Sequence, residues 1–399
     1  MGGNKVSTQM SGQDNHSWKD IVTVCSILVA AYSTYKAYQY STRLTDLPPP
    51  KNGVEELIGN TPMVLIRSLS RATGTQIYAK LELANPAGSA KDRVALSIIN
   101  TAEKQGLLTR GQKDVVFEGT SGSTGISIAA ICNSLGYRAH ISLPDDTSPE
   151  KLSLLESLGA EVNKVKPASI VDPNQYVNAS KKACDELNQN ETAEVKGVFA
   201  DQFENEANWK VHYKTTGPEI YKQMSGDIDG FIAGCGTGGT ISGVSQYLKE
   251  KLGKKVRVVL ADPQGSGFFN RIKFGVMYDR VEKEGSRRRH QVDTIIEGIG
   301  LNRITKNFHH GESNIDDAVR VTDDQAVKMA KYLSVNDGLF VGSSTAINAV
   351  AAVKLASQLG PQSRIVIIAC DSGSRHLSKF WKEALKVDQN VTIDDILKS

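Results

Sequence analysis

The feature that most constrains the fold is a regular alternation of short apolar runs with helical patterns from about residue 51 onward. Predicted strands cover 114–119, 138–143, 161–165, 197–200, 230–233, 256–261 and 364–369, and predicted helices cover 126–135, 174–188, 208–223, 240–252 and 345–358. This alternation indicates an α/β fold in which a parallel sheet carries helices on both faces. The region spans about 335 residues, which favours two lobes with a cleft between them. Ligands of such folds bind at the carboxyl ends of the strands.

Charge and cysteine content exclude several classes of protein. The 399 residues include 47 basic and 44 acidic side chains, and the net charge of +3 is too small to neutralise the phosphates of a nucleic acid. The five cysteines are widely spaced and form no C-x-x-C pair, so we expect neither a disulfide scaffold nor a zinc module. His309 and His310 lack the spacing of ligands, and we expect no metal site.

The N-terminus departs from the pattern of a plain globular enzyme. Ile21 to Tyr35 is an uncharged run, and it spans about 22 Å against a hydrocarbon core of ~30 Å. Aromatic flanks and two lysines that can reach the interface extend the candidate helix to about residues 17–40. We predict a single membrane anchor there. A helix packed on the enzyme or on a partner, and a cleaved secretory signal, are the alternatives.

Domain limits and orientation follow from this segment. We predict an N-terminal tail and anchor over 1–45, a catalytic domain over 46–386 and a short C-terminal tail over 387–399. The smaller lobe is expected at about 85–210, and the larger lobe at about 51–84 together with 211–386. Basic residues exceed acidic ones after the apolar run but not before it, which predicts that the large C-terminal part faces the cytoplasm.

The loop from Gly234 to Thr240 (GCGTGGT) joins a predicted strand to an amphipathic helix. Its glycines let backbone N–H groups approach an anion, the helix N-terminus adds a positive dipole, and two threonines offer hydroxyls. The loop therefore predicts a phosphate site. Its spacing also satisfies G-x-G-x-x-G, and Asp262 stands where a ribose-binding acid would follow, so a dinucleotide site is an alternative on spacing alone.

Three other segments carry weaker signals when each is taken alone. Thr120 to Gly125 (TSGSTG) joins a strand to a helix, and its hydroxyls and N–H groups suit a small carboxylate or phosphate. Asp371 to Ser374 is an ordinary helix cap. Lys91 by itself is a lysine in the first turn of a helix, and it is catalytic only where neighbours or a carbonyl cofactor recruit it.

Together these segments resemble the cysteine synthase and cystathionine β-synthase family of pyridoxal-phosphate (PLP) enzymes, fold type II. The resemblance covers roughly residues 51–385. Within the family, the chain most resembles the membrane-anchored mitochondrial cysteine synthase-like proteins of fungi. The motifs that carry it occur in order: Leu57–Pro62 (LIGNTP), Asn85–Arg93 (NPAGSAKDR), Thr120–Gly125, Gln202–Asn208 (QFENEAN), Thr216–Ile220 (TGPEI), Gly234–Thr240, Glu297–Gly300 (EGIG), Gly342–Ser344 (GSS) and Ser372–Arg375 (SGSR).

The resemblance implies a role for each matching position. Lys91 would be the Schiff-base lysine and the catalytic base. The remaining cofactor contacts would be Ser123, Gly236, Thr237, Gly238, Gly239, Thr240 and Ser372, with Ser372 facing the pyridine nitrogen. The substrate carboxylate would be bound by Thr120, Ser121, Gly122, Thr124 and Gln202. A hydroxyl at the ring nitrogen does not keep that nitrogen protonated, which favours loss of a β-leaving group over transamination.

The implied reaction is a β-replacement that forms L-cysteine from O-acetyl-L-serine, or a related activated serine, and sulfide. Alternatives are β-elimination from serine or cysteine, cystathionine β-synthase-type activity, and a weakly active membrane-tethered scaffold. The last alternative is motivated by Ser123, which stands where the family has an asparagine. Cys370 and Asp371 stand where the family often has Pro-Ser. The resemblance further implies a homodimer and the outer mitochondrial membrane, with the catalytic domain in the cytosol.

Overall fold

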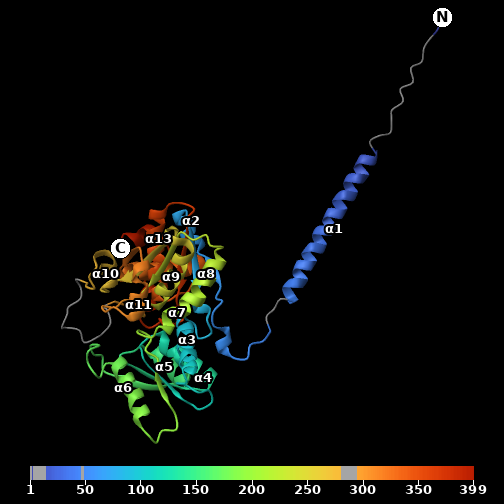
Figure 1. Ribbon diagram of the computed structural model, residues 1–399. Coiled ribbons are helices and arrows are strands. Elements are labelled where there is room, and N and C mark those ends of the chain that lie inside the picture. Colours follow the sequence, from blue (N-terminus) through green and yellow to red (C-terminus); the bar gives the residue numbers. More distant parts are fainter. Residues whose placement is uncertain (1, 3–14, 46–48, 280–293) are drawn as a thin grey trace. The chain divides into compact units, whose positions relative to one another are not determined.

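The computed structural model describes residues 2, 15–45, 49–279 and 294–399 (Figure 1). Contacts divide the chain into two units, Met1–Asn52 and Gly53–Ser399. The described part of the first unit is dominated by one long helix, α1 (Asn15–Thr45). Residues 1 and 3–14 of the predicted tail lie outside the described residues.

Helix α1 contains the apolar run. Within the described part of the chain it is the one helix that is long and apolar enough to cross a membrane, over Asp20–Gln39 with a mean hydropathy of 1.2, by length and composition only. The run has no glycine or proline to interrupt it, and the hydroxyls of Ser26 and Thr34 donate to carbonyls one turn earlier, so neither side chain lacks a partner. The predicted anchor at 17–40 lies within this helix.

The second unit contains two sheets. The larger has six strands in the order β1-β2-β10-β7-β8-β9, and the smaller has four in the order β5-β4-β3-β6. The strands of the larger sheet are β1 (Met63–Leu65), β2 (Gln76–Leu81), β7 (Gly230–Gly234), β8 (Arg257–Pro263), β9 (Asp317–Val321) and β10 (Arg364–Ala369). The strands of the smaller sheet are β3 (Val115–Gly119), β4 (Arg138–Pro144), β5 (Glu161–Val165) and β6 (Gly197–Phe199).

Helices surround both sheets. With the smaller sheet lie α3 (Lys91–Lys104), α4 (Ser123–Leu135), α5 (Pro149–Ser157), α6 (Tyr176–Gln189) and α7 (Ala207–Val211). With the larger sheet lie α2 (Arg67–Thr73), α8 (Gly217–Gln223), α9 (Gly239–Leu252), α10 (Phe268–Phe274), α11 (Lys306–Gly311), α12 (Asp323–Asp337), α13 (Ser343–Leu359), α14 (Phe380–Ala384) and α15 (Ile393–Leu397). Short turns of helix are η1 (Val54–Leu57), η2 (Glu82–Ala84), η3 (His212–Thr216), η4 (Gly253–Lys255), η5 (Glu312–Asn314) and η6 (Gly373–Arg375).

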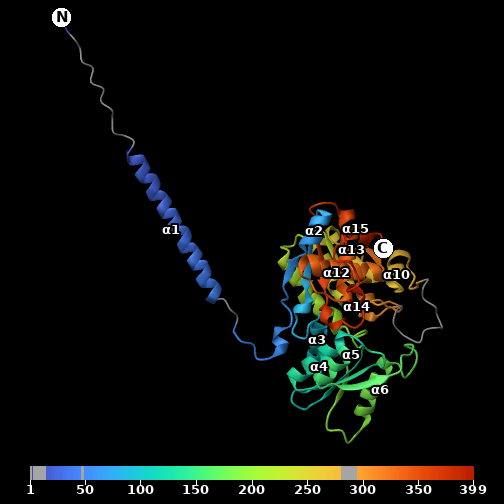
Figure 2. The same ribbon diagram turned by 180° about the vertical axis from the view of Figure 1, so that it is seen from behind.

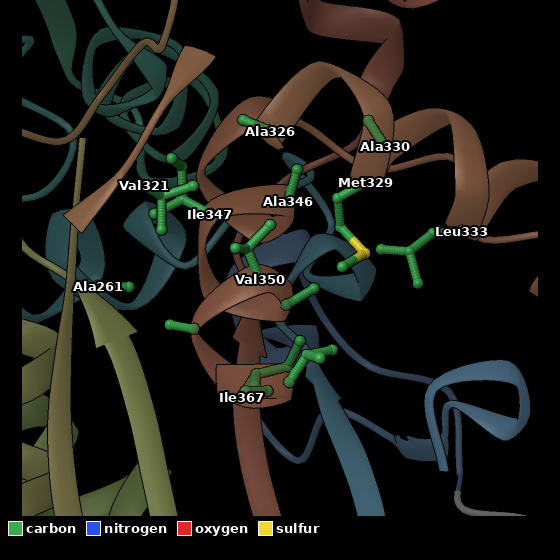
Figure 3. Close-up of a cluster of buried hydrophobic side chains, with 14 of the residues drawn as sticks. Ala261, Val321, Ala326, Met329, Ala330, Leu333, Ala346, Ile347, Val350 and Ile367 are labelled. Atoms are coloured by element: carbon green, nitrogen blue, oxygen red, sulfur yellow. The ribbon is translucent and has the colours of Figure 1, made fainter. Parts of the chain in front are cut away.

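The larger sheet is buried on both faces because successive residues of its central strands are apolar. In β10, Ile365 and Ile367 enter the core beneath α12 and α13, whereas Val366 and Ile368 enter the core beneath α9. Figure 3 shows the first core, where Ile347 and Val350 of α13 pack between the sheet and α12. Helix α9 faces the viewer in Figure 1 and α12 in the reverse view of Figure 2. Because β10 is buried on both faces, its sequence is a continuous run of apolar residues after Arg364.

The α/β fold with parallel sheets is confirmed, with one exception at the edge. Strand β1 pairs antiparallel with β2, and the sequence analysis did not predict either strand. The connection between them carries only α2, and a parallel crossover needs about a dozen residues or more. The short connection therefore forces the antiparallel arrangement.

The helix predicted over 208–223 is interrupted. It consists of α7, the π-helical turn η3 and α8. Pro218 follows the π-helical turn closely, and because proline has no N–H to donate, it interrupts the regular helical hydrogen bonding there. The turn places buried His212 behind the loop at 234–240, which is a frequent use of π-turns at functional sites.

The predicted domain limits remain predictions, but the ends of the chain show two features that bear on them. The boundary between the compact units lies at residues 52 and 53. The last residues form α15, whose Ile396 is buried in the core with α12 and α13. Residues 387–399 therefore pack on the larger lobe.

Candidate active site

One cavity of about 370 Å³ lies where strands β3, β7 and β10 end. Its wall brings together residues that are far apart in the chain, among them Lys91 and Asp371, which are 280 positions apart. Of the site residues predicted from sequence, the cavity is lined by Lys91, Thr120, Ser121, Gly122, Ser123, Thr124, Gln202, Gly236, Thr237, Gly238 and Thr240. Gly239 and Ser372 do not line it.

The loop at 234–240 connects β7 to α9, as the sequence analysis predicted. Gly238 has φ +85°, and a Cβ there would lie 2.6 Å from the Cα of Phe308. Only glycine allows this close approach and this backbone conformation. Since α9 begins directly after it, the loop presents N–H groups and the positive end of the helix dipole to the cavity.

Two buried side chains orient the hydroxyls of this loop. Asn208 Nδ2 donates to Thr237 Oγ1 at 2.9 Å, and His212 Nε2 lies 3.2 Å from Thr240 Oγ1. Burial, and then the charges of Arg93 and Lys91, keep the pKa of His212 well below its usual value, so the ring is neutral. His212 therefore positions Thr240 without adding charge. Sequence reasoning missed this role, although both residues fall in or beside the matched motifs.

Lys91 is the first residue of α3 and lines the cavity. The loop before it wraps around the carboxylate of Asp92, which accepts the N–H of Ala87 at 2.7 Å and the hydroxyl of Ser127 at 2.6 Å. Ser89 Oγ accepts the N–H of Lys91 at 3.2 Å. These contacts hold the start of the helix, and with it Lys91, at the cavity.

A buried ion network lies behind Lys91. Arg93 Nε is 2.7 Å from Glu82 Oε2, and its Nη1 is 2.7 Å from Glu219 Oε1. Lys80 Nζ is 2.7 Å from Glu219 Oε2, and Thr61 Oγ1 donates to Glu82 Oε1. The network joins three of the matched motifs, those at 57–62, 85–93 and 216–220, and so explains physically why these segments occur together.

The second predicted loop, Thr120 to Gly125, leads from β3 into α4. Thr124 Oγ1 donates to Gln202 Oε1 at 2.6 Å, and Gln202 Nε2 donates to Glu118 Oε1 at 3.2 Å. Burial raises the pKa of Glu118 to about 8 despite hydrogen bonds from Gln202. Glu118 thus fixes the amide of Gln202, and the sequence analysis had not singled it out.

Two predicted cofactor contacts differ in their surroundings. Ser123 lines the cavity, and its hydroxyl donates to Asp371 Oδ2 at 3.2 Å. Ser372 Oγ instead accepts the N–H of Ser374 at 3.3 Å and the Ser374 hydroxyl at 3.0 Å. The wall next to it is formed by Cys370 and Asp371.

Asp262, the acid that a dinucleotide site would require, does not line the cavity. It is fully buried at the end of β8 and accepts the N–H of Phe269 at 2.7 Å. Burial raises the pKa of Asp262 to about 7. Its carboxylate caps the loop into α10, so it serves the fold and not a ribose.

Comparisons with known proteins agree with this arrangement. Residues 54–371 match the family described as pyridoxal-phosphate dependent enzyme. The chain is 70% identical over 382 residues to the "putative mitochondrial cysteine synthase" of Saccharomyces cerevisiae, covering 96% of each chain. It is 56% identical over 340 residues to cysteine synthase 2 of Schizosaccharomyces pombe, covering 85% of this chain and 86% of that relative.

A solved structure with the same architecture is that of O-ureido-L-serine synthase. The TM-score is 0.71 at 30% sequence identity, covering 88% of this chain and 100% of that one. The matched family spans the loops and the lysine that line the cavity. The chain therefore belongs to the family of pyridoxal-phosphate dependent enzymes, as a cysteine synthase-like member.

Proposed function

We propose that this chain forms L-cysteine from O-acetyl-L-serine, or a related activated serine, and sulfide. The observation that carries the proposal is that Lys91, the loop at 234–240 and the loop at 120–124 line one cavity. The names of the fungal relatives, which cover most of the chain at high identity, support it.

The residues present fit the cofactor. A Cβ at Gly236 would lie 2.3 Å from the carbonyl oxygen of Gly298, so this position can hold only glycine. Its backbone N–H therefore has no side chain beside it in the loop where a phosphate group would bind. Thr237 and Thr240 would donate to phosphate oxygens, with their hydroxyls oriented by Asn208 and His212. A lysine amine at the same cavity would hold the aldehyde carbon of the cofactor.

The chain's own residues would divide the reaction as follows. The N–H groups at the start of α4, with Thr124 and Gln202, would bind the α-carboxylate of the amino acid. When bound, the cofactor supplies an electron sink for the negative charge at the α-carbon. The Lys91 amine, freed when the amino acid takes its place, would accept the α-proton as general base. Closure of the smaller lobe would exclude water while the β-substituent leaves.

Product analysis tests the proposed reaction. The full chain, loaded with pyridoxal phosphate, would be assayed with O-acetyl-L-serine or L-serine, each with and without sulfide or homocysteine. We expect cysteine from O-acetyl-L-serine and sulfide. Pyruvate formation that sulfide does not suppress would overturn the proposal in favour of elimination, and cystathionine from serine and homocysteine would favour the cystathionine β-synthase alternative.

Replacing Gly238 with alanine should weaken cofactor binding. Alanine must adopt a positive φ, which costs about 1–2 kcal/mol, and its Cβ would press on Phe308. We expect the dissociation constant of pyridoxal phosphate to rise about tenfold or more, since each loss of about 1.4 kcal/mol of binding free energy raises the dissociation constant tenfold. Fluorescence titration of the cofactor measures it.

Gly106→Ala is the matched control for this variant. Gly106 has φ +71°, but a Cβ there meets nothing within 4 Å. It therefore carries the same backbone strain without the collision. An equal loss of cofactor affinity in both variants would contradict the role of the loop.

For location, we propose that residues 17–40 anchor the chain in the mitochondrial outer membrane with the catalytic domain facing the cytosol. The apolar span at Asp20–Gln39 supports an anchor, and the basic residues after it support this orientation. One fungal relative is named mitochondrial. Imaging of the full chain and of a variant lacking residues 1–45, with protease protection of isolated mitochondria, tests the proposal. Membrane targeting retained by the truncated variant would overturn it.

We further propose a homodimer, which the family resemblance implies. Sedimentation equilibrium of the full chain in detergent measures the mass of the assembly. A monomer at micromolar concentration would contradict the proposal.

A further inference from the structure

Four charged side chains of alternating sign form a continuous chain beside the cavity, which three of them, Lys151, Glu297 and Asp371, line. Lys151 Nζ is 2.6 Å from Glu297 Oε2, and the same oxygen is 3.0 Å from His376 Nδ1. The other ring nitrogen, His376 Nε2, is 3.1 Å from Asp371 Oδ2, which also accepts the hydroxyl of Ser123 at 3.2 Å. We name the chain Lys151–Glu297–His376–Asp371 the lobe clasp.

The lobe clasp crosses the cleft. Lys151 lies in α5 and Ser123 begins α4, and both helices belong with the smaller sheet. Asp371 and His376 follow β10 of the larger sheet, and Glu297 precedes α11. A second contact runs beside it, because both oxygens of Glu150 in α5 accept from Ser378, at 2.7 and 2.8 Å.

Glu150 therefore has a use that the sequence did not reveal. The spacing from Thr147 to Glu150 resembles a capping box, but Ser148 is the N-cap of α5 and makes no side-chain cap. The carboxylate of Glu150 reaches the larger lobe instead of its own helix. The start of α5 is thus held twice to the opposite lobe.

The geometry requires a charged histidine. Each ring nitrogen of His376 faces a carboxylate oxygen, and a neutral ring has one N–H to donate where two are needed. Burial alone would lower the pKa of His376, but the charge of Asp371 and the hydrogen bonds that the ring donates to both carboxylates raise it to about 9. Hydrogen bonds from His376 and the charge of Lys151 overcome burial and lower the pKa of Glu297 to about 2.

Gly342 makes room for the clasp. A Cβ at this position would lie 2.0 Å from Asp371 Oδ1 and 2.7 Å from His376 Nε2. Its backbone N–H donates to the carbonyl of Asp371 at 3.0 Å. Any larger residue would push the carboxylate and the ring apart.

From this geometry we propose that His376 and Lys151 are positioning residues, which through the lobe clasp hold the substrate loop and α5 against the larger lobe. The inference rests on the proposed function, and none of the motifs that carry the family resemblance includes either residue. His376 acts on Ser123 through Asp371, and Lys151 holds α5 through Glu297. Neither residue takes part in the chemical step.

The consequence for catalysis is an effect on substrate affinity. A site that is already closed binds the amino acid without using binding energy for closure. When the site is closed only part of the time, its affinity falls in proportion to the fraction of molecules that are closed. Without the imidazolium, the carboxylates of Asp371 and Glu297 would repel each other within the larger lobe and shift away from their partners in the smaller lobe, Ser123 and Lys151, which would weaken the contact between the lobes. We therefore expect the clasp to lower KM for the amino-acid donor and to leave kcat nearly unchanged.

The clasp should also be sensitive to pH in one direction. The charged groups that face the His376 ring or its carboxylate partners are Asp371, Glu297, Lys151, Arg375 and Glu150, and Arg375 in turn faces Asp92. The folded pKa of His376, about 9, lies above its ordinary value of 6.5. The stabilisation it contributes is therefore complete below about pH 6.5 and is lost as the pH rises through about 9.

The test compares five full-length, cofactor-loaded proteins: wild type, His376→Gln, Lys151→Gln, Lys151→Arg and the control His309→Gln, which alters an exposed histidine. We expect KM for O-acetyl-L-serine to rise about tenfold in His376→Gln and Lys151→Gln, with kcat within about twofold. Lys151→Arg keeps the charge and should restore KM. A sixth protein combines His376→Gln with Lys151→Gln, and its KM should be about that of either single variant, because both substitutions break the same chain of contacts.

Two measurements without turnover separate this inference from the proposed reaction. Hydrogen exchange of residues 120–124 and 149–157, without amino acid, should be faster in His376→Gln and Lys151→Gln than in wild type. The difference in unfolding free energy between wild type and His376→Gln should vanish above about pH 9. Unchanged KM and exchange in Lys151→Gln would overturn the clasp, as would a loss confined to kcat. If the wild type forms no cysteine but hydrogen exchange is faster in both variants, only the proposed reaction would be overturned.

Discussion

Replacing Lys91 with alanine should lower the rate of cysteine formation at least about 10³-fold, the range expected when a general base that also binds the cofactor is lost. Lys91 is the one lysine of the family's N-P-A-G-S-A-K-D-R segment, and it lines the cavity together with both anion-binding loops. Its backbone N–H is held by Ser89, and the neighbouring Asp92 is held by Ala87 and Ser127, so the loop should keep its shape without the amine.

Steady-state assay of the full chain measures this loss, with Lys104→Ala as control. Lys104 lies exposed at the opposite end of the same helix, so its removal changes the charge of α3 without touching the cavity. Borohydride reduction followed by peptide mapping provides a second readout, in which the cofactor should be found on residue 91 of the wild type. Full activity in Lys91→Ala, or cofactor attached to another lysine, would contradict the assignment.

Replacing Arg93 with leucine should destabilise the folded catalytic unit by about 3–5 kcal/mol, the cost of removing one partner of a buried ion pair. Arg93 is 2% exposed, and Glu82 beside it is fully buried, so the carboxylate would be left without its cation in the interior. Unfolding entropy is about 2.1 cal/mol/K per residue. For the unit Gly53–Ser399, this loss of stability should lower the melting temperature by about 4–7 °C relative to wild type.

Thermal unfolding of the full chain measures this effect, and Arg110→Leu is the control. Arg110 pairs with Glu103 at 2.7 Å but is 56% exposed, and exposed pairs contribute about 0–1 kcal/mol. Equal shifts in the two variants would show that burial of the Arg93 network is not the source of its stabilisation.

The Arg93 network should also affect how the free energy of unfolding changes at acid pH. Against the effect of burial, hydrogen bonds from Arg93 and Lys80 lower the pKa of Glu219 to about 2. A lowered pKa contributes stability above the ordinary value of 4.5, and this contribution is lost as the pH falls through about 2. Unfolding curves at pH 2.5 and pH 6 should therefore differ less in Arg93→Leu than in wild type.

The core strands were predictable because burial leaves a local trace in the sequence. Strand β10 at 364–369 was predicted with the bounds that the structure has, and five of its six residues are buried. Strand β1 left no such trace. Strand β1 is only partly buried, and its antiparallel pairing depends on the length of the connection through α2.

The loops of the site were predictable for a related reason. Glycines at positive φ and hydroxyls at helix N-termini are local requirements of anion binding, so the loops at 120–125 and 234–240 were visible before the fold was known. Gly239 was grouped with the residues that bind the cofactor, but a Cβ there would lie 1.9 Å from Asn208 Oδ1. The close approach of Asn208 requires glycine at this position, and the cofactor contact of Gly239 remains a prediction.

By itself, the sequence determined the fold class, the order of the core elements and the loops predicted to bind anions, because each depends on neighbours along the chain. The tertiary structure decided which distant side chains share a cavity and what each charged group contacts. The neutral ring of His212 depends in part on Arg93 and Lys91, and the charged ring of His376 depends in part on Glu297, all of them at least 79 positions away in the chain. Ionisation depends on burial and on charges within a few ångströms, and only the folded chain places those charges.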